Sequence, residues 1–180
     1  MTGDLEEALG PHIPALRRFA RALLRDTDAA DDLVQDCLMR AISRWHLRRD
    51  NGALRAWLFT ILYNLFVSER RALARRGGPS VPIEDWDRIA PAMDGRSAAE
   101  DHLALRDLMA GLEGLPDEQR ALVLLVGVED LSYEEAARVT GVPLGTVMSR
   151  LSRARDHLRR HLEGEAGTAM AAEPACRRLP

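Results

Sequence analysis

The stretch from Leu131 to His161 most constrains this fold, because it predicts two short helices with a tight turn between them. Ser132 and Glu135 have the spacing of a capping box, which starts a helix. Gly141 can adopt the left-handed conformation that ends a helix. Pro143 suits the first turn of the next helix, because a proline there gives up no hydrogen bond. Two helices joined by a short glycine-containing turn are the layout of a helix-turn-helix, which we therefore predict here.

The second helix of that motif carries the side chains of a DNA reader. The spacing of its apolar residues predicts a buried seam along one side of this helix, made of Val147, Leu151, Ala154 and Leu158. Residues 143–161 hold five arginines and one aspartate, a local charge of +4. A helix N-terminus favours phosphate, and arginine can reach guanine edges. We predict major-groove contacts from Thr146, Ser149, Arg150 and Arg153. The alternative is a basic helix that only faces solvent.

The composition excludes some classes of protein but does not identify the function. The chain has 180 residues, 46% of them hydrophobic and 29% charged, which is typical of a globular protein with a packed core. All 25 basic residues are arginine, which suits phosphate and guanine, although codon bias in a GC-rich genome would give the same result. Cys37 and Cys176 lie far apart, so no disulfide framework is expected and a cytoplasmic location fits. We find no signal peptide and no run of apolar residues long enough to insert into a membrane.

The first half of the chain predicts helices over residues 14–25, 29–45 and 54–76. The helix over 29–45 has a continuous apolar stripe, made of Leu33, Val34, Cys37, Leu38, Ala41, Ile42 and Trp45. Its other face carries Asp32, Gln35, Asp36 and Met39. This second face is either simply solvated or a docking surface for a basic partner helix.

The helix over 54–76 is apolar on almost every side in its first half. Phe59, Tyr63 and Phe66 form an aromatic stripe, which is either more core or a platform for unstacked bases. The arginines that follow, Arg70, Arg71, Arg75 and Arg76, face one acid, Glu69, a local charge of +3. Because a single-strand binder needs aromatic and basic groups side by side, we favour the platform.

The organisation is all-α, with two small helical domains joined by a flexible linker. The first domain spans residues 1–76. A stretch rich in Gly, Pro, Ser and acids predicts the linker at 77–97. The second domain spans 98–163 and ends with the helix-turn-helix. The tail, 164–180, has no periodicity, and we expect it to be disordered.

No pattern of an enzyme is present in the sequence. There is no glycine-rich phosphate loop after a strand and no convincing nucleophile–base arrangement. His157 and His161 are four residues apart and could share a helix face, but nothing near them supplies further metal ligands. We therefore expect neither a metal nor a cofactor.

Four stretches in order resemble the bacterial RNA polymerase sigma factors of the extracytoplasmic-function (ECF) class. They are DAADDLVQDCLMRA at 28–41, RAWLFTILYN at 55–64, LPDEQR at 115–120 and LSYEEAARVTGVPLGTVMSRLSRAR at 131–155. With the helices between them they cover roughly residues 11–162. At position 148, where many members carry Lys or Arg, this chain has Met148.

The resemblance implies a role for each surface. Asp32, Gln35, Asp36 and Met39 would dock on the clamp coiled coil in the largest subunit of core RNA polymerase. The helix over 54–76 would read and melt the −10 element. A flipped base would be captured by Tyr63, Asn64, Leu65 and Phe66, and the strand backbone would follow Arg70, Arg71 and Arg75. The helix after Pro143 would read the −35 element in promoter DNA, and an anti-sigma factor is an expected partner.

Two other functions remain open from the sequence. A stand-alone helix-turn-helix regulator would bind DNA tightly without polymerase, usually as a dimer. A sigma mimic would titrate an anti-sigma factor without touching DNA. The basic helix after Pro143 argues against the mimic.

Overall fold

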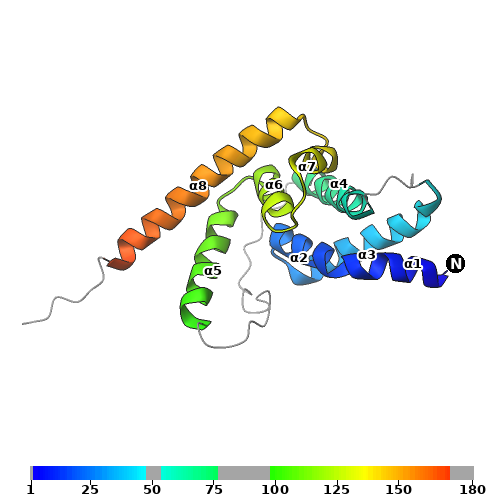
Figure 1. The fold of residues 1–180 in the computed structure, drawn as a ribbon, viewed down its shortest axis with the longest axis horizontal. Helices are drawn as coiled ribbons and strands as arrows, with labels where there is room; N and C mark the ends of the chain where they lie inside the picture. The colour runs from blue at the N-terminus through cyan, green and yellow to red at the C-terminus, as the bar shows by residue number, and fades with distance from the viewer. Residues whose placement is uncertain (1, 48–53, 77–97, 171–180) are drawn as a thin grey trace, which may run out of the picture.

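The computed structural model describes residues 2–47, 54–76 and 98–170, and all regular structure in these ranges is helical. Figure 1 shows the order of the helices along the chain. The first half holds α1 (Thr2–Leu9), η1 (Gly10–His12), α2 (Ile13–Leu24), α3 (Thr27–Ser43), η2 (Trp45–Leu47) and α4 (Leu54–Arg75). The second half holds α5 (Ala98–Glu113), α6 (Asp117–Gly127), α7 (Tyr133–Thr140) and α8 (Leu144–Met170). The predicted all-α class is confirmed, and α1 is a helix that the sequence did not predict.

The turn between α2 and α3 follows from its side chains. Arg25 adopts a left-handed conformation with φ of 62° and ends α2. The carboxylate of Asp26 accepts hydrogen bonds from the backbone N–H groups of Asp28 and Ala29, both at 3.0 Å. This cap satisfies donors that the helix itself leaves free, so α3 begins at Thr27, two residues before the predicted start.

The first half is a bundle of α2, α3 and α4 with an aromatic contact at its centre. The rings of Phe19 and Phe59 meet edge to face with centroids 5.3 Å apart. Cys37 is also buried, and its thiol donates to the Leu58 carbonyl oxygen at 3.5 Å. Of the predicted stripe, Leu33, Val34, Cys37 and Ala41 are buried, and Leu38 and Trp45 are half-buried. Ile42 is exposed, one residue before α3 ends.

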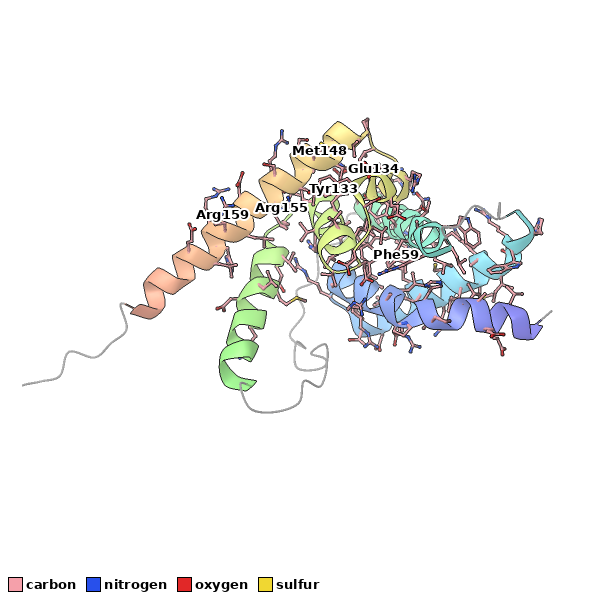
Figure 2. All side chains as sticks on the ribbon, viewed as in Figure 1. Phe59, Tyr133, Glu134, Met148, Arg155 and Arg159 are labelled. Atoms are coloured by element: carbon pink, nitrogen blue, oxygen red, sulfur yellow. The ribbon has the colours of Figure 1, made fainter. Side chains whose placement is uncertain are left out.

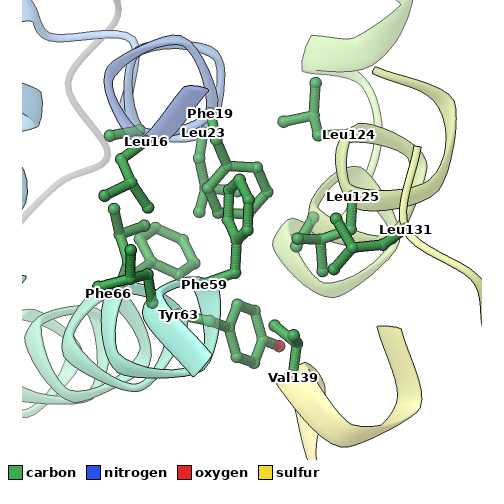
Figure 3. Close-up of a cluster of buried hydrophobic side chains, with 14 of the residues drawn as sticks. Leu16, Phe19, Leu23, Phe59, Tyr63, Phe66, Leu124, Leu125, Leu131 and Val139 are labelled. Atoms are coloured by element: carbon green, nitrogen blue, oxygen red, sulfur yellow. The ribbon is translucent and has the colours of Figure 1, made fainter. Parts of the chain in front are cut away.

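The two halves share one hydrophobic core instead of forming separate ones. α2 and α4 pack against α6 and α7 of the second half. In Figure 3 the side chains of Phe59 and Tyr63 of α4 lie opposite Leu125, Leu131 and Val139, which come from the second half. This explains why α4 is apolar on almost every side: one side faces α2 and α3, and another faces the second half.

The α5–α8 pair extends away from that core, and α8 is the longest helix of the described ranges (Figure 1). A Cβ at Gly114 would lie 2.6 Å from His157 Nε2, and one at Gly111 would lie 2.9 Å from His161 Cδ2. The two glycines thus let the imidazoles of α8 lie against α5. No described helix combines the length and apolar character needed to cross a bilayer.

Residues 164–170, the first part of the predicted tail, are helical in the structure, because α8 continues to Met170. Alanine and glutamate in this stretch allow a helix without any apolar period, which is why periodicity missed it. Residues 171–180, with Cys176, lie outside the described residues, and so does the predicted linker at 77–97.

Candidate nucleic-acid interface

α7 and α8 form the predicted helix-turn-helix. The hydroxyl of Ser132 accepts a hydrogen bond from the Glu135 N–H at 3.2 Å, and the Glu135 carboxylate accepts one from the Ser132 N–H at 2.9 Å. This capping box lowers the pKa of Glu135, chiefly through the bond from the Ser132 backbone. Gly141 ends α7 with φ of 70°, and α8 begins directly after Pro143. The turn predicted from these residues is confirmed.

The predicted major-groove residues all lie within the first ten residues of α8 but differ in their exposure to solvent. Ser149 and Arg153 are exposed, and Thr146 is half-buried. Arg150 is half-buried and forms an ion pair with Glu118 of α6. The Arg155 guanidinium donates to the Tyr133 hydroxyl at 3.1 Å and joins α8 to α7 (Figure 2). α7 therefore fixes the orientation of α8, as a reading helix requires.

Of the residues predicted to hold a flipped base, three are buried in this conformation. Tyr63 is 6% exposed, Leu65 is buried, and Phe66 is 2% exposed, whereas Asn64 faces solvent. Figure 3 shows Tyr63 beside Val139 of α7. With Phe59 also buried, the aromatic stripe offers no open face to a base here. In this structure the aromatic stripe is therefore part of the hydrophobic core.

The predicted DNA-contacting arginines at the end of α4 also differ, because some are exposed and one is paired within the protein. Arg71 and Arg75 are exposed. Arg70 stands 5.9 Å from the ring centroid of Phe66, and its Nε lies 2.7 Å from Asp117 Oδ2 of α6. A cation over an aromatic face and beside a carboxylate is held by both. One of the three predicted backbone contacts is thus occupied within the protein.

Two neighbouring acids of α6 bring the two predicted DNA-contact sets together. Asp117 pairs with Arg70 of α4, and Glu118 pairs with Arg150 of α8. Tyr63 lies in the same region: burial raises the pKa of its phenol most, and the Glu118 carboxylate raises it further while Arg150 opposes the shift. The residues predicted to read separate DNA elements therefore lie around one helix end.

The acidic face of α3 is open to solvent. Asp32, Gln35 and Asp36 are exposed, and Met39 is 69% exposed. Glu69 of α4 adjoins them: burial raises the pKa of its carboxyl most, followed by the Asp36 carboxylate. An exposed methionine among acids is a surface that fits a basic helix with apolar side chains. Glu69 was not predicted as part of this face, because its contact with α3 is tertiary.

A carboxylate that the sequence did not single out lies at the contact between the halves. Glu129, in the loop after α6, is 0% exposed. Arg18 of α2 donates to it from Nε and Nη2, both at 2.8 Å, and Arg55 of α4 donates from Nη2, also at 2.8 Å. Charge-assisted bonds of this number can hold a buried carboxylate.

Arg120 ties the same halves together through backbone oxygens. It is a buried arginine, and its guanidinium donates to the carbonyl oxygens of Leu112, Leu115 and Leu23 at 3.0 to 3.1 Å. Leu23 lies in the last turn of α2, so Arg120 binds the negative end of that helix dipole. Desolvation of the buried guanidinium is the main reason why the pKa of Arg120 is lowered. Arg120 belongs to the LPDEQR motif, whose other function in the fold is to start α6.

Comparisons with known proteins agree on one family. The family model described as the Sigma2 domain of PhyR matches residues 9–63, and the one described as Sigma-70, region 4 matches residues 105–158. The ECF RNA polymerase sigma factor EcfG of Rhodopseudomonas palustris is 38% identical over 159 residues, which cover 88% of this chain and 84% of that protein. The RNA polymerase sigma-E factor of Streptomyces coelicolor is 34% identical over 170 residues, which cover 94% and 92%.

A solved structure agrees as well. The sigma factor RpoE from Bartonella quintana, crystallised in complex with the anti-sigma factor NepR, is 38% identical and matches with a TM-score of 0.73. The match covers 89% of this chain and 97% of that one.

Proposed function

The chain belongs to the family of ECF RNA polymerase sigma factors, and we propose that it binds core RNA polymerase in the cytoplasm and directs promoter-specific transcription initiation. The main support for this proposal is that the chain has two separate surfaces of opposite charge. An acidic face on α3 and a basic reading helix, α8, lie on different halves of one chain. A protein that connects an enzyme to DNA needs two such surfaces.

The face of Asp32, Gln35, Asp36 and Met39 is proposed to dock on the clamp coiled coil of the largest subunit. Exposure of all four side chains supports this role, since each is available to a partner without rearrangement. The carboxylates would steer a basic helix, and Met39 would supply apolar contact once it is desolvated. Glu69 adds a further negative charge at the edge of this face.

Promoter DNA is proposed to meet the chain at two places. Thr146, Ser149, Arg150 and Arg153 would read the −35 element from the major groove. At the −10 element Tyr63, Asn64, Leu65 and Phe66 would hold a flipped base, with the backbone along Arg70, Arg71 and Arg75. The exposure of Ser149, Arg153, Arg71 and Arg75 supports this assignment.

We also propose an anti-sigma factor as a partner. The similar sigma factor RpoE was crystallised with the anti-sigma factor NepR, and the likeness extends over 89% of this chain. A protein partner that held both halves together would act on the contact already present between α2, α4, α6 and α7.

The test compares DNA binding with and without polymerase. A mixture of the protein and core polymerase should elute as one complex and bind promoter DNA that neither component binds tightly alone. Tight, specific binding by the protein alone would favour the stand-alone regulator. Failure to bind core, together with tight binding of an anti-sigma factor, would favour the sigma mimic.

A further inference from the structure

The structure describes four sulfur-containing side chains, and they differ in their access to solvent. Cys37 is buried, and burial raises the pKa of its thiol to about 12. Met109 of α5 is half-buried against the core, and Met148 of α8 is 49% exposed. Met39 of α3 is 69% exposed, the largest value among the exposed large hydrophobic side chains described. A dissolved oxidant therefore reaches the sulfur of Met39 more readily than the other three.

The thioether of Met39 can be oxidised by a peroxide in one step. A lone pair of the sulfur attacks one oxygen of hydrogen peroxide, so that an S–O bond forms while the O–O bond breaks. The leaving hydroxide takes the proton of the transferred oxygen and becomes water. The sulfur loses two electrons, the peroxide gains them, and the product is methionine sulfoxide. This reaction needs no ionisation, whereas a thiol must first become a thiolate, which the buried Cys37 does not do at neutral pH.

Met39 supplies apolar surface to a face that is otherwise polar. Gln35 and Asp36 lie one turn before it on α3, because residues three and four apart share a helix face. Ile42 lies one turn after it and is 51% exposed. The two apolar side chains are therefore neighbours at one end of the acidic face. In a complex, the acids would supply the charge of the contact, and Met39 with Ile42 would supply its apolar area.

Oxidation changes the kind of contact that Met39 can make. The sulfoxide oxygen is a hydrogen-bond acceptor, and covering it costs free energy unless the partner offers a donor at that point. The exposed Ile42 beside it requires an apolar partner surface there. A partner that fits the reduced face would therefore leave the sulfoxide oxygen without a donor.

We propose that Met39 is a site of reversible oxidation by peroxides, and that its sulfoxide form weakens the binding of core polymerase to α3. The oxidation itself depends on the exposure of Met39 alone, whereas its effect on binding rests on the proposed function. Methionine sulfoxide can be reduced again by thiol-dependent reductases. The modification would thus lower promoter-directed transcription while oxidant is present and release it afterwards.

The test follows oxidation and binding on the same samples of the full chain, in a Cys176→Ser background. The protein is treated with graded amounts of hydrogen peroxide, and mass spectrometry measures the oxidation of each methionine. Competition with labelled, untreated protein then gives the affinity for core polymerase. Met39→Leu keeps an apolar side chain without sulfur, and Met148→Leu removes the other exposed methionine as the matched control. Each variant is compared only with its own untreated sample, so its starting affinity does not enter the result.

Met39 should be oxidised before Met148 and Met109. At the dose that oxidises Met39 alone, the wild type and Met148→Leu should lose about fivefold or more in affinity for core. Met39→Leu should lose none relative to its untreated sample. The two methionine sulfoxide reductases, one for each sulfoxide epimer, should restore the affinity of the wild type. Saturating core should also slow the oxidation of Met39, because docking covers its side chain.

Oxidation of Met148 or Met109 ahead of Met39 would overturn the assignment of the site. The effect on binding would be overturned by an unchanged affinity after complete oxidation of Met39, by an equal loss in Met39→Leu, or by equal oxidation of Met39 with and without core. Loss of the helical circular dichroism at the same dose would also count against it, since a change at an exposed position should leave the fold intact. An untreated protein that does not bind core would instead contradict the proposed function, and the order of methionine oxidation would still test the site.

Discussion

Nε of Arg70 lies 2.7 Å from Oδ2 of Asp117, and this pair joins an arginine proposed to follow promoter DNA to the first residue of α6. The pair is only partly buried, so its energy is modest. The pair instead limits the access of DNA to Arg70, because Arg70 cannot bind a phosphate and Asp117 at the same time.

Replacing Asp117 by asparagine should therefore raise the affinity of the free protein for single-stranded DNA. We expect about a fivefold gain at low salt, since one more arginine becomes available to the backbone. Fluorescence anisotropy with labelled DNA measures the change. Glu7→Gln removes the same charge from an exposed position on α1 and serves as the control. Equal gains in both variants would mean that net charge alone is responsible.

A charge reversal on α3 tests the polymerase face. Asp36→Arg should weaken binding to core by about tenfold or more, because a like charge would meet the basic partner helix. Glu6→Arg, a reversal at an exposed site on α1, should leave the affinity within about twofold of wild type, as expected for a charge outside the interface. Competition between each variant and labelled wild type for core gives both numbers. An unchanged affinity for Asp36→Arg would remove this face from the interface.

On the reading helix, Arg153→Ala should cost about 1–3 kcal/mol in binding of the polymerase complex to the −35 element, while core binding stays intact. Arg153 is exposed and ready for contact. Arg159→Ala, six residues further along α8, should have a smaller effect that does not depend on the base sequence. Loss of core binding by Arg153→Ala would show that this residue has another role.

Met148 offers a gain of function. It is 49% exposed on α8 and lies between the predicted contacts Thr146 and Ser149. Met148→Arg should add one phosphate contact, so the plot of log affinity against log salt should steepen by about 1. Met148→Leu keeps the side chain apolar and should leave the slope unchanged. A steeper slope in neither variant would place position 148 outside the DNA interface.

The thiol of Cys37 should be inert in the folded protein. Burial raises its pKa from 9.0 to about 12, and the charge of Arg40 acts in the opposite direction. Since the folded pKa exceeds the unfolded one, the neutral thiol's contribution to stability is complete below pH 9.0 and is lost as the pH rises towards 12. In a Cys176→Ser variant, a thiol reagent at pH 8 should react only after denaturation. Reaction at the rate of a free thiol before unfolding would contradict this burial.

Most of the fold that could be predicted from the sequence depends on interactions between residues close together in the chain. The capping box at Ser132 and the left-handed Gly141 act over a few residues, and the structure confirms both. The apolar character of α4 indicated that more than one face would be covered. It could not indicate the second half as the cover, because that contact joins distant parts of the chain.

Contacts between distant residues explain what the sequence left out. Glu129 lies 111 residues from Arg18 and 74 from Arg55, and nothing in its neighbours Val128 and Asp130 predicts burial of a carboxylate. The same applies to Arg120, whose third acceptor, Leu23, is 97 residues away. Candidate DNA contacts could be chosen by residue type, but their availability depends on how the halves pack.

Sigma-factor activity of this chain can be measured by run-off transcription of a genomic library with core polymerase. A sigma factor should yield a defined set of transcripts that appears only when the protein is added. Their start sites should share one −10 and one −35 sequence, and the products should be lost with Asp36→Arg. Absence of any promoter-specific transcript, under conditions where the protein is bound to core, would contradict sigma-factor activity.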